Sequence, residues 1–432
     1  MNLMKISILN EYAAFDSNLP EEIHVLLKLE FFPPSEVTQR PPIHMGLVLD
    51  RSGSMAGEKL EMTKQSAIYF MNWLTRRDFL SIIAYDDQVQ VLIPHTPLLN
   101  KQELTNQIRR LHPGGSTNLS GGMIRGFSEI KGNVQAGHIH RLFLLTDGLA
   151  NVGITEPPRL VEIVQKNLEK GVALTTLGFG HDFDEMLLKS LADAGGGRFH
   201  YVKEPEGLAR AFQAEFGELS TLIAQNLEVH VEGEGNLESI ELLTDYPHEK
   251  KGRKVETRIG DVRAGDVKLA LLRMRVDKEI WKGKSPLLLG KIDIQCDTLV
   301  GEMECERQSV TLEIPPASET QKPLERNPEV AQEIWICKTA ELKLKAAQKM
   351  AQGNFKKELE ELQEHAKRGE MLGKSPLANV VRMETINLQD IIKQATSSEN
   401  EQNRQWRSRV SKNWVEESCK SRSSREIGRA HV

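Results

Sequence analysis

The sequence has few cysteines, and they are not arranged as metal ligands. Four occur among 432 residues, and none has the short Cys-x-x-Cys spacing of a structural zinc site. In "IDIQCDTLVGEMECE", Cys296 and Cys305 would be opposite each other if the chain turned at Val300-Gly301, which would allow a cross-strand disulfide. We expect reduced thiols instead, because so few cysteines are typical of a protein from a reducing compartment.

The sequence also lacks a long apolar run and an excess of basic charge. No stretch has the length of apolar sequence needed to cross a bilayer, so we predict no membrane span. The first segment, "MNLMKISILNEYAAFDSNLPEE", carries acidic residues where a signal peptide would be apolar, which favours a cytoplasmic protein. With 56 Lys and Arg against 61 Asp and Glu, the net charge is −5. Nucleic acid is therefore not an expected partner, because phosphate binding requires a basic face.

The chain is long enough for about two to four domains, and its middle part alternates strand-like and helix-like segments. The alternation predicts a doubly wound α/β domain over residues 41–217, with a mostly parallel, Rossmann-like sheet covered by helices on both faces. Continuous apolar runs such as "RLFLLTD" fit strands buried on both faces. We expect strands at 43–49, 79–85, 88–93, 140–146, 172–179 and 198–202, and helices at 58–74, 101–111, 119–131, 156–170, 183–194 and 205–224.

The segment 218–315 has a different pattern, with short alternating stretches such as "NLEVHVEGEG" and "GKIDIQCD" between Gly, Asp and Lys turns. This pattern predicts an antiparallel β-sandwich. Residues 1–40 contain a similar strand, "EEIHVLLKLEFF", which cannot bury itself alone. Our hypothesis is that residues 1–40 join the sandwich, so that the α/β domain is inserted within it.

The C-terminal part is predicted to be helical over residues 326–396, after a polar, proline-containing linker. An apolar stripe that includes Val330, Ile334 and Cys337 favours packing of the first helix on the sandwich over docking on a partner. We expect residues 397–432 to be disordered. The last six, "IGRAHV" (427–432), match what a common sequencing adapter encodes, and we expect them not to be native.

Three short motifs place oxygen-bearing side chains after strands or in a glycine-rich loop. "LVLDRSGSMAG" carries Asp50, Ser52 and Ser54 after the first strand of the α/β domain, "GGSTNLSGG" carries Thr117, and "LLTDG" carries Asp147. In a doubly wound sheet, ligands bind outside the carboxyl ends of the strands where the strand order reverses. If the strands 43–49 and 140–146 are neighbours there, all five side chains converge.

The types of these five side chains indicate the ligand. All are hard oxygen donors, without His or Cys, which favours Mg²⁺, or Mn²⁺ or Ca²⁺, over zinc. Three of the five are neutral hydroxyls, so we expect the cation to be incompletely neutralised and to leave one position for an outside ligand. A carboxylate of Asp or Glu from a partner protein would suit that position.

The five residues resemble the metal-ion-dependent adhesion site (MIDAS) of the von Willebrand factor A (VWA) domain, with every element in order. The resemblance spans roughly residues 41–217. It implies that the hydroxyls of Ser52, Ser54 and Thr117 contact the metal directly in the ligand-bound form, and that Asp50 and Asp147 act largely through water. It also implies divalent-cation-dependent protein–protein binding.

A wider and looser resemblance rests on "LTDGLANVG", on "LADAGGGRFHYV" and on the sandwich around the α/β domain. These features are similar to bacterial proteins related to calcium-activated chloride-channel regulators and inter-α-trypsin-inhibitor heavy chains. The resemblance does not imply a channel, because no membrane span is predicted.

Other interpretations of the motifs remain. Asp50, Ser52 or Ser54 alone could cap the following helix. An accessory subunit of an ATPase or chelatase-like complex is the alternative function, and a Mg²⁺-dependent phosphatase ranks below it, because Ser52 stands where such enzymes have a second acid. No nucleophile with a recognisable base occurs, so we predict no catalytic residues and no organic cofactor.

Several histidines and acids outside these motifs receive simpler interpretations. We expect His138 and His140 to lie in solvent at the entry of their strand. In "GFGHDFDE", a loop and a helix N-cap account for Asp182 and Asp184, and we do not expect His181 to be catalytic.

Overall fold

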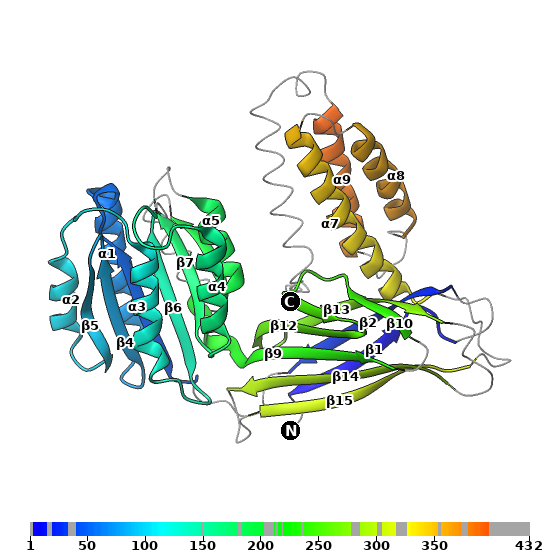
Figure 1. Ribbon diagram of the computed structural model, residues 1–432, viewed down its shortest axis with the longest axis horizontal. Helices are drawn as coiled ribbons and strands as arrows, with labels where there is room; N and C mark the ends of the chain where they lie inside the picture. Colours follow the sequence, from blue (N-terminus) through cyan, green and yellow to red (C-terminus); the bar gives the residue numbers. More distant parts are fainter. Residues whose placement is uncertain are drawn as a thin grey trace.

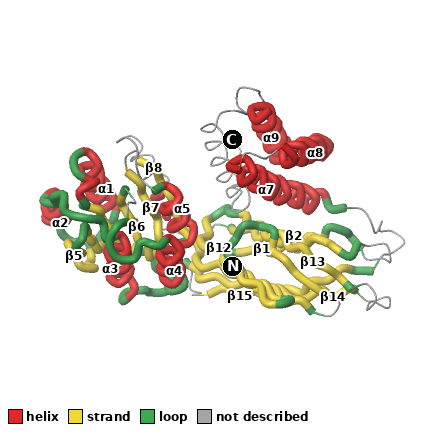
Figure 2. Tube along the Cα trace, turned by 45° about the horizontal axis from the view of Figure 1, so that its top comes forward, coloured by secondary structure: helices red, strands yellow, loops and turns green. Residues whose placement is uncertain are grey.

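The fold consists of an α/β domain, a β-sandwich and a helical region, which lie side by side in the computed structural model (Figures 1 and 2). The structure describes residues 3–14, 20–32, 40–147, 150–179, 184–202, 211, 215–217, 219–234, 237–277, 286–299, 305–316, 326–352, 356–372 and 379–396. The predicted disordered tail, 397–432, lies outside them.

The α/β domain contains a six-stranded sheet that is parallel except at one edge. Its strand order is β5-β4-β3-β6-β7-β8, and only the pair β4 and β5 is antiparallel. The predicted doubly wound sheet is therefore confirmed. The strands are β3 (Ile43–Asp50), β4 (Phe79–Tyr85), β5 (Val89–Pro97), β6 (Ile139–Thr146), β7 (Ala173–Phe179) and β8 (Gly196–Val202).

Helices cover both faces of this sheet, and each face has its own apolar core. On one face, α1 (Glu58–Trp73) and α2 (Lys101–Arg109) pack over a cluster centred on Phe70 and Phe143. On the other face lie α3 (Leu119–Lys131), α4 (Pro157–Leu168) and α5 (Glu185–Ala194). Because every strand between them is covered on both sides, β3, β6 and β7 are buried at every position, as their continuous apolar runs require.

Side-chain caps fix the start of several of these helices. Asn118 accepts a hydrogen bond from the Gly121 amide at 2.9 Å at the start of α3. Asp184 accepts one from the Leu187 amide at 3.0 Å and caps α5, as predicted. His181 and Asp182, from the same stretch, lie outside the described residues.

The predicted helix 205–224 extends too far. Strand β9 (Leu222–Gly233) already begins at Leu222, where the chain pairs with Arg263 of β12. The apolar residues Leu222 and Ile223 fit a helix pattern as well as a strand, and the hydrogen bonds of the sandwich decide between them. Of the helix itself, the structure describes residues 211, 215–217 and 219–221, all helical.

The sandwich contains two antiparallel sheets that share one apolar core. The first has the order β1-β2-β13-β10 and the second β11-β12-β9-β14-β15. Strands β1 and β2 come from residues 1–40, and β2 pairs with β13 along its length. The strands are β1 (Met4–Asn10), β2 (Glu22–Phe31), β9, β10 (Leu237–Leu242), β11 (His248–Lys251), β12 (Lys254–Arg263), β13 (Val267–Val276), β14 (Leu287–Thr298) and β15 (Cys305–Ile314).

The two cysteines of the sandwich are not opposite each other. In the pair of β14 and β15, Cys296 faces Glu306, and Cys305 faces Asp297. The predicted cross-strand alignment is therefore wrong by one position. In an antiparallel pair such a shift removes the direct opposition that a disulfide would need.

The helical region contains α7 (Pro328–Gln352), α8 (Lys356–Leu372) and α9 (Asn379–Thr396). The first turns of α7 pack on the outer face of the first sandwich sheet, where Val330 and Cys337 contact Leu26 and Leu271. The remainder of α7 forms an apolar core with α8 and α9, above the sandwich in Figure 1. No helix in the described part of the chain is long and apolar enough to cross a membrane.

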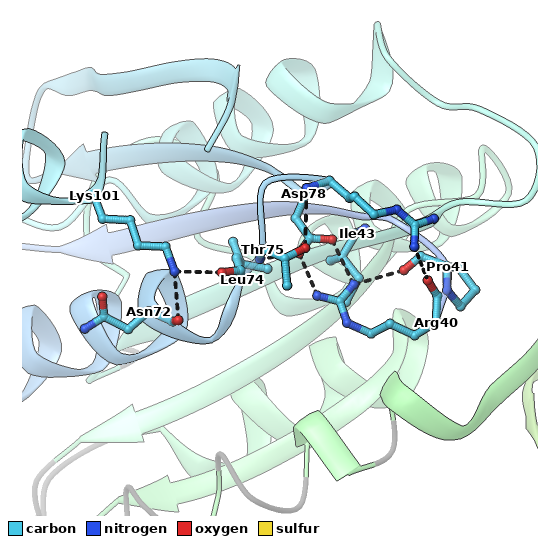
Figure 3. Close-up of polar contacts among 9 residues, drawn as sticks. Arg40, Pro41, Ile43, Asn72, Leu74, Thr75, Asp78 and Lys101 are labelled. Atoms are coloured by element: carbon cyan, nitrogen blue, oxygen red, sulfur yellow. Dashed lines mark hydrogen bonds and ion pairs between the residues drawn. The ribbon is translucent and has the colours of Figure 1, made fainter. Parts of the chain in front are cut away.

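A buried carboxylate holds the linker that enters the α/β domain (Figure 3). Asp78 is fully buried and accepts both guanidinium nitrogens of Arg40, at 2.8 and 2.6 Å. It also accepts the Ile43 amide at 2.9 Å, and the amide and hydroxyl of Thr75 at 2.6 and 2.8 Å. The Arg40 guanidinium in turn lies over the Trp73 ring, 4.6 Å from its centroid. One carboxylate therefore connects the linker, the start of β3 and the loop after α1.

Two further ion pairs connect the α/β domain with the sandwich. Arg141 of β6 donates to Asp261 of β12 at 2.5 Å, and Arg258 of β12 lies 3.1 Å from Glu169 at the end of α4. Leu299, which follows β14, is part of the apolar core of the α/β domain. The sandwich thus contacts the α/β domain at the amino ends of the parallel strands, opposite to their carboxyl ends.

Candidate metal site

The two predicted aspartate ligands lie where the strand order of the α/β sheet reverses. Asp50 is the last residue of β3, and Asp147 directly follows β6. Strands β3 and β6 are adjacent and parallel, and the chain leaves β3 toward β4 on one side and returns to β6 on the other. The expected proximity of these two strands is confirmed, and in doubly wound sheets ligands generally bind at such a reversal of the strand order.

Asp50 is held rigidly by three hydrogen bonds. Its Oδ1 accepts the Ser52 amide at 2.8 Å, and its Oδ2 accepts the hydroxyls of Thr146 at 2.6 Å and Tyr85 at 3.2 Å. Burial raises the pKa of Asp50, and the bonds from Thr146 and Ser52 oppose that rise. A bound cation would favour the ionised carboxylate further.

The two serines form a hydrogen-bonded pair beside Asp50. The hydroxyls of Ser52 and Ser54 lie 3.2 Å apart; Ser52 is buried and Ser54 is exposed. Helix α1 has Gly57 as its N-cap and no side-chain capping bond. The capping interpretation of Asp50, Ser52 and Ser54 is therefore wrong for this helix, and their hydroxyl and carboxyl oxygens remain at the sheet edge.

The loop that carries Thr117 is joined to the Asp50 loop by backbone hydrogen bonds. The Gly53 amide donates to the Gly115 carbonyl at 2.8 Å, and the Gly114 amide donates to the Arg51 carbonyl at 2.7 Å. These bonds bring the glycine-rich loop across the end of the sheet. Thr117, two residues further on, is thereby held beside the first motif.

The position of this loop depends on Gly114 and on the side-chain amide of Asn151. A Cβ atom on Gly114 would lie 1.8 Å from Oδ2 of Asp86, so a larger residue there would have to displace the Asp86 side chain. Thr117 is buried, and its amide donates to Oδ1 of Asn151 at 2.7 Å. Gly114 thus allows close packing of this loop against the loop that carries Asp86.

Asp147 has one oxygen that fits a cation. Its Oδ2 accepts Lys59 Nζ at 3.1 Å. Its Oδ1 is buried, and within the described part of the chain it has no hydrogen-bond partner. An unsatisfied buried carboxylate oxygen is costly unless a ligand pairs with it. Gly148, which follows, lies outside the described residues.

The five residues together fit a hard divalent cation. Asp50, Ser52 and Ser54 form one hydrogen-bonded group, Asp147 adjoins it through Thr146, and Thr117 is held there by its loop. Among the described residues, no cluster of three or more His, Cys, Asp and Glu side chains is arranged to hold a metal. A site here would depend on hydroxyl oxygens, which suit Mg²⁺ or Mn²⁺ better than Zn²⁺.

Several residues that contact this group were not among the predicted ligands, including Tyr85, Asn151, Thr146 and Lys59. Thr146 precedes Asp147 on the same strand, and Lys59 lies in the first turn of α1. The sequence contained a signal for Lys59, because a cation in the first turn of a helix is opposed by the helix dipole and needs another reason to be there. Thr146 gave no such signal within an apolar strand.

Four histidines lie close together at the amino ends of the parallel strands. The prediction that His138 and His140 lie in solvent is wrong. His44 and His140 are 0% and 2% exposed, because parallel pairing places them opposite each other on β3 and β6. The His44 Nδ1 lies 3.0 Å from His95 Nε2, and its Nε2 lies 2.9 Å from His138 Nδ1. His138 is itself half-buried.

Burial, together with the neighbouring rings, lowers the pKa of these imidazoles and so favours their neutral form. Burial, followed by the neighbouring His140, His95 and His138, lowers the pKa of His44 to about 3, with Asp78 acting in the opposite direction. Burial, followed by His138, lowers the pKa of His140 to about 4. The group is therefore a pH-sensitive part of the core and is remote from the predicted metal site.

The α/β domain matches one family model, and longer segments of the chain match known proteins. Residues 45–214 match the family model described as the von Willebrand factor type A domain. The Escherichia coli protein YfbK is 27% identical over 250 residues, which cover 57% of this chain and 43% of that protein. Human inter-alpha-trypsin inhibitor heavy chain H3 is 28% identical over 213 residues, 46% of this chain and 23% of that one. The chain thus spans less than half the length of these two relatives, and the predicted resemblance to the heavy chains is confirmed.

Solved structures resemble the whole chain. A von Willebrand factor type A protein from Catenulispora acidiphila has a TM-score of 0.69 at 14% identity and covers 98% of this chain and 97% of its own. The ArnB paralog VWA2 from Sulfolobus acidocaldarius has a TM-score of 0.58 at 15% identity, with coverage of 98% and 100%. At these identities the likeness shows the fold alone.

Proposed function

Residues 45–214 form a von Willebrand factor type A domain, and on this premise we propose that the chain binds a protein partner through a divalent cation at Asp50, Ser52, Ser54, Thr117 and Asp147. The cation would be Mg²⁺, or Mn²⁺ or Ca²⁺. When bound, it supplies a Lewis-acidic position for a carboxylate of Asp or Glu on the partner. Domains of this family commonly mediate metal-dependent protein–protein interactions.

One observation carries this proposal. Two buried carboxylates converge at the switch point of the sheet, and the Oδ1 of Asp147 is without a hydrogen-bond partner in the described chain. The bonds from Thr146 and Tyr85 hold Asp50 in place, so little reorganisation is needed to bind a cation. Three neutral hydroxyls complete the donor set, which is the composition of a binding site that leaves room for an outside anion.

The same residues favour binding over catalysis. Ser52 stands two residues after Asp50, where a phosphatase of the aspartyl type needs an acid to protonate the leaving group. Tyr85 is fully buried behind Asp50, and burial raises its pKa well above the ordinary value. We therefore propose a binding protein and not an enzyme.

Removal of a metal-binding hydroxyl is the direct test. We expect Ser54→Ala to weaken Mg²⁺ binding by at least about tenfold, measured by isothermal titration calorimetry, and Asp50→Ala to abolish it. Ser54 is exposed, so its replacement should leave the fold intact. Mg²⁺ at 100 times its Kd should stabilise the native protein by about 2.7 kcal/mol, and EDTA should reverse this.

Ser116→Ala provides the matched control, because Ser116 is exposed and adjoins Thr117 in the same loop but is not a predicted ligand. It should bind Mg²⁺ like the wild type. Equal Mg²⁺ affinity in the wild type and in Asp50→Ala, or none in the wild type, would contradict the proposed site. Affinity capture of partners by the wild type and by Asp50→Ala, each in Mg²⁺ and in EDTA, then tests whether partner binding depends on the metal.

A further inference from the structure

Among the described residues, Lys59 is a basic side chain that contacts one of the proposed metal ligands, Asp147. Its Nζ lies 3.1 Å from Oδ2 of Asp147, and its side chain is 25% exposed whereas that of Asp147 is fully buried. Lys59 is the second residue of α1, where the helix dipole opposes a cation and favours acids such as Glu58 and Glu61. Its place is therefore explained by Asp147 and not by the helix.

The charge of the site depends on this lysine. Two ionised aspartates would balance a divalent cation completely, so the expectation that the neutral hydroxyls leave the cation incompletely neutralised is wrong for these five residues taken alone. Lys59 adds one positive charge. Among the described residues, Arg51 next to Asp50 has a partner in Asp86 at 3.2 Å, and these two charges cancel. Asp50, Asp147 and Lys59 together therefore carry a net charge of −1 without the metal and +1 with a divalent cation bound.

We propose that Lys59 is the residue that makes this site change the sign of its charge on metal binding, and so makes it select a carboxylate ligand. The inference rests on the proposed function. Without metal, the net negative group repels a partner's carboxylate. With metal, the group has one uncompensated positive charge, which a single carboxylate neutralises.

Two consequences follow for binding. Lys59 competes with the cation for Asp147, so it lowers the affinity for the metal alone. The same lysine raises the affinity of the metal-loaded site for an anion, because it removes the neutral balance between metal and aspartates. Metal and carboxylate therefore bind with positive coupling, and by linkage each raises the affinity for the other by the same factor.

Lys59→Met is the decisive variant, because methionine keeps the length of the aliphatic stem and removes the charge. In the full chain, we expect Mg²⁺ to bind at least about tenfold more tightly than in the wild type, by calorimetry. In the Mn²⁺-loaded protein, we expect acetate to bind at least about tenfold more weakly, followed through the relaxation of water protons. An ion pair with a structural role only would not move the two affinities in opposite directions.

Two controls separate charge from position. Lys59→Arg keeps the charge and should bind both probes nearly like the wild type. Lys64→Met makes the same substitution in the same helix, at a lysine that pairs with Glu61 at 2.7 Å, and should change neither affinity. Unchanged or weaker Mg²⁺ binding in Lys59→Met, or unchanged acetate binding, would overturn the inference. A wild type that binds no Mg²⁺ would instead contradict the proposed function.

Discussion

Replacing Asp78 by alanine is expected to lower the free energy of unfolding of the α/β domain by about 3–5 kcal/mol, the cost of breaking a buried ion pair from one side. The carboxylate is fully buried and accepts five hydrogen bonds, two of them from Arg40. Its loss would leave the amides of Ile43 and Thr75 without this acceptor, and the Arg40 guanidinium would keep only its bond to the Pro41 carbonyl among the described residues. Urea unfolding followed by circular dichroism and fluorescence measures the change.

The control for this prediction is an ion pair of the same type on the surface. Glu162 accepts Lys166 at 2.6 Å on α4, with both side chains largely exposed. Glu162→Gln should leave stability unchanged within error, because solvent screens such a pair. A double-mutant cycle of Asp78→Ala with Arg40→Met should give a coupling energy of about 1–3 kcal/mol. A loss below about 1 kcal/mol in Asp78→Ala would show that the linker is not held by this carboxylate.

Acid is expected to destabilise the α/β domain through its buried histidines, by about 4 kcal/mol between pH 7.5 and pH 5. The pKa values of His44 and His140 fall to about 3 and 4 in the fold, against about 6.5 in the unfolded chain. The folded state therefore favours the neutral rings and binds fewer protons than the unfolded state at pH 5. The contribution of the two neutral rings to the free energy of unfolding is complete above pH 6.5. It is lost as the pH falls toward their pKa values in the folded state, and the loss is about 2 kcal/mol for each ring at pH 5.

His44→Gln tests this assignment, because glutamine stays neutral at every pH. The variant should lose about 2 kcal/mol less stability than the wild type between pH 7.5 and pH 5, whatever its stability at pH 7.5. Unfolding is measured in EDTA, so that metal binding does not contribute. His112, an exposed histidine in the loop between α2 and α3, supplies the control, and His112→Gln should keep the wild-type pH dependence. The same loss in His44→Gln as in the wild type would assign the acid sensitivity to other groups.

Periodicity was enough to predict the elements whose local and tertiary preferences agree. The expected helix 119–131 is α3 to the residue, since Asn118 supplies a cap before an apolar stripe. The expected helix to residue 224 failed because Leu222 and Ile223 belong to β9, whose partners β12 and β14 lie far along the chain. A short apolar run does not distinguish these outcomes without its partners.

The candidate site divides in the same way. The sequence sufficed to propose Asp50, Ser52, Ser54, Thr117 and Asp147 as candidate ligands, because strand ends and glycine-rich loops leave a clear local pattern and parallel strands bring their carboxyl ends to one end of the sheet. Lys59 could not be assigned to the site, since its contact with Asp147 spans 88 residues of sequence. The charge of the site therefore became apparent only from the fold.

The sequence by itself determined the class of the α/β domain, the order of its elements and the oxygen donors at the ends of β3 and β6. Those features are encoded locally, in apolar runs, glycines and helix caps. Only the tertiary structure decided that β2 pairs with β13 across more than 200 residues, that His44 and His140 are neighbours in the core, and that Lys59 reaches Asp147. Each of these is a contact between segments distant in sequence, and its physical cause is the packing of surfaces that no local pattern records.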